Sequence, residues 1–245
     1  MPAAILARSV VLEARRGGLP WLVIGALAAA AALAAFVSQV ALTESVALRL
    51  AVLAAVLRAC AVFLITAQVT ASALREIEDK GLELALSLPI SRAAHYLGRL
   101  AGFTLCGALI ALVFAAPLLI WAPPAAVALW GVSLAFETAL VAAAALFFAM
   151  TLAQFVPALA ATVGLYLLAR SIGAIQAIAE DGRFARHAAD AIALLMPNLD
   201  EMTRTAWLLY EAPHAAAYAA ALGGACIYIA LLVAAGLFDF YRRSV

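Results

Sequence analysis

Two oppositely charged residues lie deep inside apolar stretches of the sequence. Arg58 and Glu137 each stand about eleven or twelve residues from one end of a predicted membrane span, which places them at a similar depth at about 1.5 Å per residue. Ionisable side chains are costly in hydrocarbon, where they pair with one another or mark a path for ions or substrate. Two interpretations therefore stay open: an ion pair that joins two spans, and a charged part of a substrate path. Arg170 lies nearer the end of its span, where it can reach headgroups or face an outer vestibule.

A second distinctive stretch is the charged segment from 75 to 92. On a helical wheel one stripe is apolar and comprises Ile77, Gly81, Leu84 and Leu88, and Pro89 ends the predicted helix. A short amphipathic helix at a membrane face is suited to contact a partner, whereas a solvated charged loop is the alternative interpretation. The side chains predicted to make polar contacts are Glu76, Glu78, Asp79, Lys80 and Glu83, with Leu84 and Leu88 packing against the bundle.

The composition identifies an integral membrane protein. Hydrophobic residues make up 68% of the chain and charged residues 12%, with a mean hydropathy of +1.10. Soluble domains have roughly 45 to 50% apolar and about 25% charged residues. The net charge is +1 and no basic patch stands out beyond the arginines that flank the spans, so we expect membrane lipids and not nucleic acid as surroundings.

Six windows are long and apolar enough to cross a bilayer, which needs about 20 residues. They run from about 19 to 39, 47 to 73, 93 to 121, 125 to 151, 153 to 175 and 212 to 238. Only 151 to 154 join the fourth and fifth, so these two are expected to be antiparallel neighbours. The sequence thus predicts an all-α integral membrane protein with a single transmembrane domain over 1–245.

Lysine and arginine near the span ends predict the orientation, because short loops rich in them stay cytoplasmic. They precede the first span, flank the second connection and end the chain: Arg8, Arg15, Arg16, Arg75, Lys80, Arg92, Arg99, Arg242 and Arg243. Both termini, the segment 1–18 and the loop 75–92 are therefore expected in the cytoplasm. The first apolar run is longer than a secretory signal core, which favours an uncleaved span.

The segment 176–211 on the other side carries six acidic and three basic residues. Pro197 interrupts it, and Asn198 with Glu201 three positions later has the spacing of a capping box. We expect two short amphipathic helices here, with Pro197, Asn198, Asp200 and Glu201 at an outer gate.

No motif for catalysis or nucleotide binding occurs in the sequence: GxxxxGK[ST], HExxH and GxSxG are all absent. The histidines and cysteines are too scattered for a metal site: His95, His187, His214, Cys60, Cys106 and Cys226. We therefore expect a chain that is not itself an enzyme and has no metal or cofactor of its own.

The segment from Lys80 to Arg92 resembles the cytoplasmic loop of ABC-type export permeases of the type-2 family. In that family an acidic-Gly-Thr-Leu-Glu-Leu-Leu-Leu-Ser-Leu-Pro-Ile-Ser-Arg pattern precedes the third span. Here the sequence reads KGLELALSLPISR, with Leu82 in place of the usual Thr and Ala85 in place of Leu. Both changes keep the apolar stripe, although the motif covers less than a tenth of the chain.

This resemblance implies a permease subunit of an ATP-driven exporter in a bacterial inner membrane. Two such subunits, identical or related, would pair, and each would carry a separate cytoplasmic ATPase subunit that binds ATP and Mg. The helix in 75–92 would be the coupling helix that docks on this ATPase. Short helices between the fifth and sixth spans are also implied by the family.

Two other classes stay open. Arg58 and Glu137 motivate an ion-coupled secondary transporter or channel, although the two halves of the sequence show no convincing repeat of the kind common in such proteins. A non-transporting scaffold that recruits a cytoplasmic partner through 75–92 is the second. The substrate does not follow from the sequence.

Overall fold

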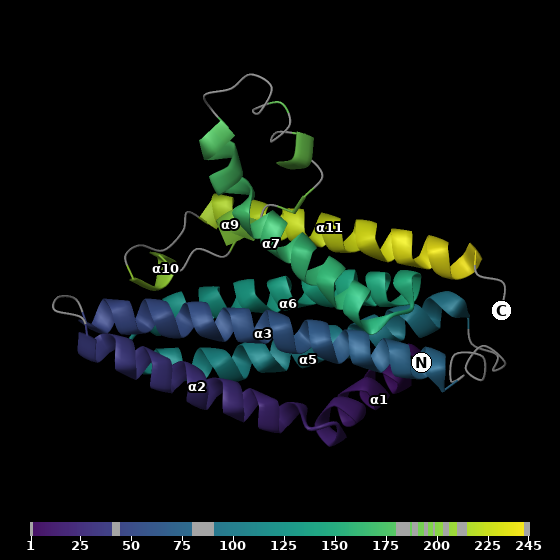
Figure 1. Cartoon of the computed structure of the whole chain (residues 1–245), viewed down its shortest axis with the longest axis horizontal. Coiled ribbons are helices and arrows are strands. Elements are labelled where there is room, and N and C mark those ends of the chain that lie inside the picture. Colours follow the sequence, from purple (N-terminus) through teal and green to yellow (C-terminus); the bar gives the residue numbers. More distant parts are fainter. Residues whose placement is uncertain are drawn as a thin grey trace.

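The computed structural model describes residues 2–40, 45–79, 91–179 and 215–242, together with 187, 191–193, 196–197, 199–202 and 206–209. All elements formed by these residues are helical, and six helices are long and apolar enough to cross a membrane (Figure 1). Helices satisfy their own backbone hydrogen bonds, which is why an apolar chain of this kind folds into them in a bilayer. The chain is a multi-pass α-helical membrane protein.

The membrane-length helices are α2 (Leu19–Val40), α3 (Ser45–Glu78), α5 (Arg92–Ala115, extended by the 3-10 turn η1, Ala116–Ile120), α6 (Pro124–Leu152), α7 (Phe155–Ala179) and α11 (Ala215–Arg242). Their number and order agree with the six predicted spans. Three helices end later than predicted: α7 continues to Ala179, α11 to Arg242, and α3 through Glu78 as one helix. The first residues of 75–92 therefore belong to the second span and do not start a separate loop helix.

Helix α6 forms the centre of the bundle. In the most apolar 18-residue stretch of α6, 67% is buried inside the bundle, whereas the corresponding share is 17% in α2 and in α11. Figure 1 shows α3, α5 and α6 side by side along the long axis, with α2 on one flank and α11 on the opposite flank. The exposed apolar side chains of α2 and α11 include Trp21, Phe36, Ile227 and Phe238. Such faces suit contact with lipid.

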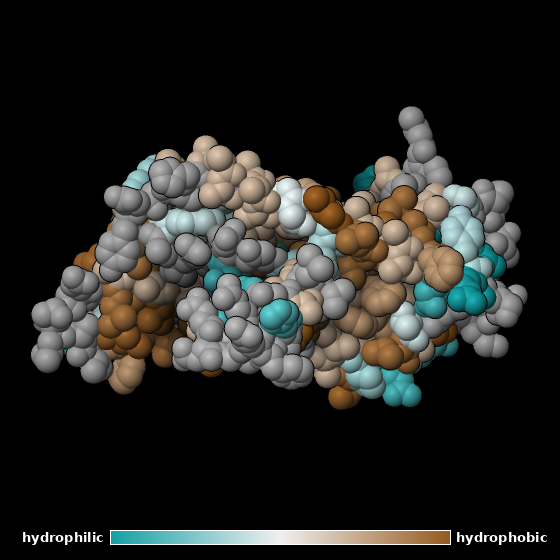
Figure 2. Space-filling model, turned by 90° about the horizontal axis from the view of Figure 1, so that it is seen from above, coloured by the Kyte–Doolittle hydropathy of each residue, from teal (hydrophilic) through white to brown (hydrophobic). Residues whose placement is uncertain are grey.

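The two ends of the bundle differ in charge. Arg75, Arg92, Arg99 and Arg242 lie at the end where α3 finishes, α5 begins and α11 finishes, which we call the arginine-rich end. Figure 2 shows hydrophilic surface gathered at this right-hand end, next to broad hydrophobic areas. The α6 to α7 turn lies at the same end, because α6 finishes at Leu152 and α7 begins three residues later. The predicted tight turn between the fourth and fifth spans is thus confirmed.

A further helix, α1 (Pro2–Arg16), precedes the spans, where only a cytoplasmic segment was predicted. Val10 and Ala14 are buried against α5. The approach is close: a Cβ at Gly102 would lie 2.6 Å from the Cβ of Val10 and 2.9 Å from the carbonyl oxygen of Ala7. Only glycine fits there without a shift. The chain then turns into α2 at Gly18, whose φ of +87° favours glycine.

Between α7 and α11 lie the four-residue helices α9 (Leu199–Met202) and α10 (Ala206–Leu209). Leu199 and Met202 are buried, and α9 contacts both α7 and α11. These two helices fall within the predicted segment 176–211. Much of that segment lies outside the described residues, and so do residues 80–90, on which the predicted coupling helix falls.

Candidate functional site

The two intramembrane charges meet at mid-height in the bundle. Arg58 lies 13 positions after Ser45, where α3 begins, and Glu137 lies 13 positions after Pro124, where α6 begins. Both helices start at the end opposite the arginine-rich end, so each side chain sits about 20 Å along its helix. The sequence predicted a similar depth, because both residues lie eleven or twelve positions from one end of their predicted spans.

Arg58 is held by three groups on α6. Its Nη1 forms an ion pair with Oε2 of Glu137, and its Nη2 donates a hydrogen bond to Oγ of Ser133 at 3.0 Å. The guanidinium lies over the ring of Trp130, 5.1 Å from the ring centroid. Arg58 is 1% exposed and the other three residues are fully buried. The two spans are therefore joined by an ion pair that is buried within the bundle.

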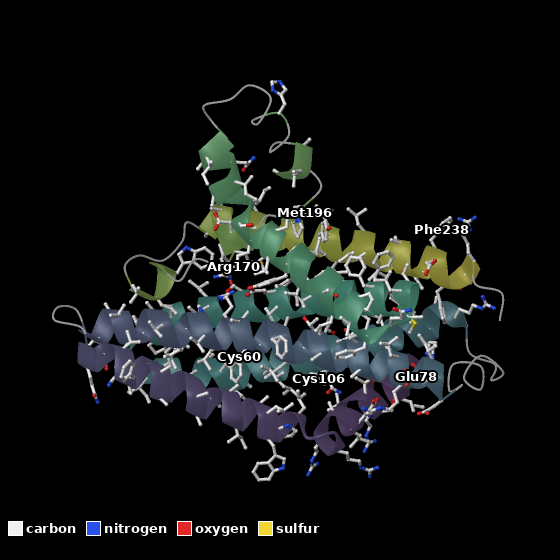
Figure 3. All side chains as sticks on the ribbon, in the orientation of Figure 1. Cys60, Glu78, Cys106, Arg170, Met196 and Phe238 are labelled. Carbon is white, nitrogen blue, oxygen red and sulfur yellow. The ribbon has the colours of Figure 1, made fainter. Side chains whose placement is uncertain are left out.

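The second carboxylate oxygen of Glu137 faces α7. The hydroxyl of Tyr166 donates to Oε1 at 2.7 Å, and Nη1 of Arg170 donates to that hydroxyl at 3.2 Å. Arg170 Nη1 is itself 3.6 Å from Oε1 of Glu137. Figure 3 labels Arg170 on α7, where it points toward the bundle. We call Arg58, Ser133, Glu137, Tyr166 and Arg170 the mid-bundle network.

The mid-bundle network has unequal charges, with two guanidinium groups for one carboxylate. Arg58 and Glu137 neutralise one another, as buried ions in hydrocarbon must. Arg170 supplies the remaining positive charge, and its side chain is 34% exposed. The arrangement can fix α3, α6 and α7 relative to one another, and it can present one cation to a molecule beside α7.

Tyr166 was not singled out from the sequence, although it carries a central bond of the network. A signal was present, because Tyr166 lies four residues before Arg170 and thus on the same face of α7. In an apolar span a tyrosine on the same face as an arginine offers a hydroxyl for that polar contact.

A second polar group lies at the arginine-rich end and joins α1, α3 and α5. Arg99 forms an ion pair with Glu76, and its Nη2 donates to Oγ of Ser72 at 2.8 Å. Ser72 in turn donates to Oε1 of Glu13 at 2.8 Å. Nε2 of His95 lies 3.3 Å from Oε1 of Glu76. We call Glu13, Ser72, Glu76, His95 and Arg99 the end cluster.

Helix α11 is attached next to the end cluster. Nη1 of Arg92 donates to the backbone carbonyls of Phe240 and Tyr241 at 3.3 and 3.4 Å. Free carbonyls at a helix C-terminus are natural acceptors for such a cation. The ring of Phe240 stacks on His95 with 6.4 Å between centroids. The first residues of α5 therefore bind the last turn of the sixth span.

The residues predicted to contact an ATPase separate into three groups. Glu76 is mostly buried and already paired within the chain, so it is a poor candidate for a direct contact. Glu78 and Asp79 are exposed at the end of α3, and Figure 3 shows Glu78 at the arginine-rich end. The others lie outside the described residues: Lys80, Glu83, Leu84, Leu88 and Pro89.

The predicted outer gate is described in part. Pro197 is buried, and with Tyr166 it lines a crevice too small for a water molecule. The Asp200 carboxylate lies against Gly173 of α7, so close that a Cβ there would fall 3.3 Å from Cγ. Asn198 and the side chain of Glu201 lie outside the described residues. The described part of this segment therefore packs next to the mid-bundle network.

Among the residues that the structure describes, no three histidine, cysteine or acidic side chains are grouped so that they can hold a metal ion. Comparison of the chain with models of known protein families and with curated proteins gave no match. The features that bear on function are therefore the bundle, its two polar groups and the position of residues 80–90 between α3 and α5.

Proposed function

We propose that the chain is the permease subunit of an ATP-driven exporter of the type-2 ABC class, with 80–90 as the segment that a separate ATPase subunit moves. One observation carries this proposal. The segment is bounded by two long continuous helices, α3 and α5, whose ends are bonded to each other by the end cluster. If the ATPase moves this segment, α3 and α5 would therefore move together.

The contacts describe how such a displacement would spread. Arg99 bonds to Glu76 and Ser72, so α3 and α5 move as one body. Arg92 holds the last turn of α11, and the pair of Arg58 with Glu137 transmits tilting of α3 to α6. Packed helices shift as rigid elements and do not deform continuously. The bundle would act as a lever.

In this proposal the arginine-rich end, with both termini, faces the cytoplasm of a bacterial inner membrane. The ATPase binds ATP and Mg, and this chain supplies no catalytic group. Glu78 and Asp79, which are exposed, make polar contacts to it together with Lys80 and Glu83. A second permease subunit, identical or related, completes the translocation path.

The cargo in this proposal is lipid-like or amphipathic. Apart from the mid-bundle network, the spans expose mainly apolar side chains, and such surfaces do not stabilise a strongly charged solute. Arg170 is the partly exposed cation of that network, and a cargo with an anionic group can contact it.

Purification of the tagged chain from its native membrane tests the proposal. We expect an ATPase subunit with a Walker motif to co-purify in stoichiometric amount, and Leu84→Asp to abolish both its recovery and the ATPase activity. Leu84→Met is the matched control, because it keeps the apolar character at that position. An eluate without ATPase, from a chain that is inserted and folded, would exclude an ABC permease.

Glu137 supports a second candidate, an ion-coupled transporter, because a buried carboxylate bonded to Tyr166 and Arg58 is also typical of proton and ion paths. Transport in reconstituted vesicles distinguishes the candidates. Cargo movement that requires ATP and the co-purified subunit supports the exporter. Movement that follows an imposed proton or ion gradient without ATP, and is lost in Glu137→Gln, supports the alternative. A chain that binds a partner yet moves no cargo is a scaffold.

A further inference from the structure

A groove lies in the angle between α1 and α2 and is lined by residues of α1, α2 and α5. Helix α1 crosses α5 at Gly102 and the chain then turns at Gly18, so the last turn of α1 and the first turns of α2 form two sides of the groove. The space left has a volume of about 360 Å³. Cys106, which Figure 3 labels, lies on α5 above this angle and lines the groove. We call this space the elbow groove.

The walls of the elbow groove are apolar and come from all three helices. They include Val11 and Ala14 of α1, Leu19 and Val23 of α2, and Leu109 and Val113 of α5. Among the described residues that line it, Arg15 alone is charged. An open apolar groove with one cation in its lining offers apolar walls for an acyl chain and a positive charge for a lipid phosphate.

The surroundings of Arg15 strengthen this interpretation. Arg15 and Arg16 are exposed in the last turn of α1, and within the described part of the chain neither makes a hydrogen bond or ion pair. Trp21, on the first turn of α2, is 78% exposed. Tryptophan and arginine side chains gather at the boundary between hydrocarbon and headgroups. The rim of the groove therefore lies where lipid phosphates are found.

We propose that the elbow groove binds an anionic phospholipid, with one acyl chain between α1, α2 and α5 and the headgroup phosphate on Arg15. The apolar walls alone give no preference, because one lipid replaces another of equal apolarity. Charge decides instead: an anionic headgroup adds attraction to Arg15 and Arg16 that a zwitterionic one lacks. The bound lipid would support α1, whose Glu13 belongs to the end cluster.

A helix of a second copy fits this space less well. A helix with its side chains has a diameter of about 10 Å, so a single turn of about 5.4 Å already occupies roughly 400 Å³. The groove holds about 360 Å³. An acyl chain is much thinner and can follow the slot between the helices. The proposal does not depend on the proposed transport function, because it concerns only the folded chain in a bilayer.

Native mass spectrometry of the whole chain in mild detergent tests the proposal. The probes are dioleoyl phosphatidylglycerol and dioleoyl phosphatidylcholine, which share acyl chains and differ in headgroup charge. We expect the first phosphatidylglycerol to bind about fivefold more tightly than the first phosphatidylcholine. The attraction of one basic residue to an anionic lipid corresponds to about this factor. Arg15→Gln should remove this preference. Arg8→Gln, at an exposed arginine of α1 outside the groove, should keep it.

Blocking the apolar slot gives an independent test. Val113 is 43% exposed on the groove wall, so Val113→Trp can fill the space without displacing the core. We expect this variant to lose the tight phosphatidylglycerol while its helix content and monodispersity stay unchanged.

Four outcomes would overturn the proposal. The first is equal binding of the two lipids, and the second is a preference for phosphatidylglycerol that survives Arg15→Gln. The third is a loss of this preference that is equal in Arg15→Gln and Arg8→Gln. The fourth is an unchanged preference in folded Val113→Trp. The third would show diffuse attraction to a basic helix. A dimer that Val113→Trp dissociates would show that a second copy occupies the groove instead.

Discussion

The mid-bundle network and the end cluster both join α3 to its neighbours through arginine and glutamate, yet their surroundings differ. Arg58 and Glu137 are almost fully buried in the middle of the apolar spans. In the end cluster Glu76 is 16% exposed, and Glu13, to which Ser72 donates, is 37% exposed. The other three residues of the end cluster are themselves buried, but solvent reaches its two glutamates and can replace a lost partner there, which it cannot do at the Arg58–Glu137 pair.

This difference separates two tasks. The Arg58–Glu137 pair of the mid-bundle network holds its geometry because every alternative leaves a buried charge without its partner. The end cluster can exchange partners at lower cost, since water and neighbouring polar groups are close. The lever that we propose would need both properties: a fixed point within the bundle, and an end whose contacts adjust when an ATPase subunit moves the segment between α3 and α5.

The largest effect is expected from Arg58→Ala. It leaves the carboxylate of Glu137 buried without its main partner, and breaking a buried pair in this way costs about 3–5 kcal/mol. We expect SDS titration of the purified chain in mixed micelles to show that loss of unfolding free energy. The double variant Arg58→Ala, Glu137→Ala should be more stable than Arg58→Ala alone. Additive losses would show that the two charges act separately.

The second largest loss of unfolding free energy is expected for Gly102→Ala, which acts on the end cluster through α1. The added methyl overlaps Val10 and the backbone of Ala7, and overpacking of this kind costs about 1–3 kcal/mol. Displacement of α1 also separates Glu13 from Ser72. Gly25→Ala is the control, because a Cβ there meets no atom within 4 Å. Equal stability of the two variants in the same titration would contradict the close packing of α1 on α5.

A smaller effect is expected for Tyr166→Phe. The change removes the hydroxyl that donates to Glu137 at 2.7 Å but leaves the ion pair with Arg58. Hydrogen bonds between membrane helices and to charged groups suggest a loss of about 1–2 kcal/mol in the unfolding titration. Tyr228→Phe serves as control, since Tyr228 makes no side-chain hydrogen bond to the described residues. A loss as large as that of Arg58→Ala would mean that Tyr166, and not Arg58, is the main support of Glu137.

The smallest effect is expected for Arg75→Ala. Arg75 is 64% exposed and its guanidinium lies 4.0 Å from Glu13, so water screens the pair. Exposed pairs contribute less than about 1 kcal/mol, and we expect a change near the low end of that range in the same titration. A loss comparable to that of Tyr166→Phe would show that the end of the bundle is drier than its exposure indicates.

The class of protein and the positions of its six membrane-length helices follow from the amino-acid sequence alone. Twenty or more apolar residues in a row leave few folds other than a membrane helix, so this part needs no tertiary information. The equal depth of Arg58 and Glu137 also followed from counting along two helices. The turn between α6 and α7 was predictable because so few residues connect them.

The contacts between the helices could not be predicted in this way and became known from the three-dimensional structure. Counting along a helix gives depth but not rotation, so it did not show that Tyr166 and Ser133 face the ion pair or that Glu76 meets Arg99. From the sequence, residues 1–18 were predicted only as a cytoplasmic segment, without the helix α1. Its helical apolar stripe is short, and its docking depends on a glycine some 90 positions later, at Gly102. Lateral packing in a bilayer has no large hydrophobic driving force, and small shape matches and single polar contacts decide it.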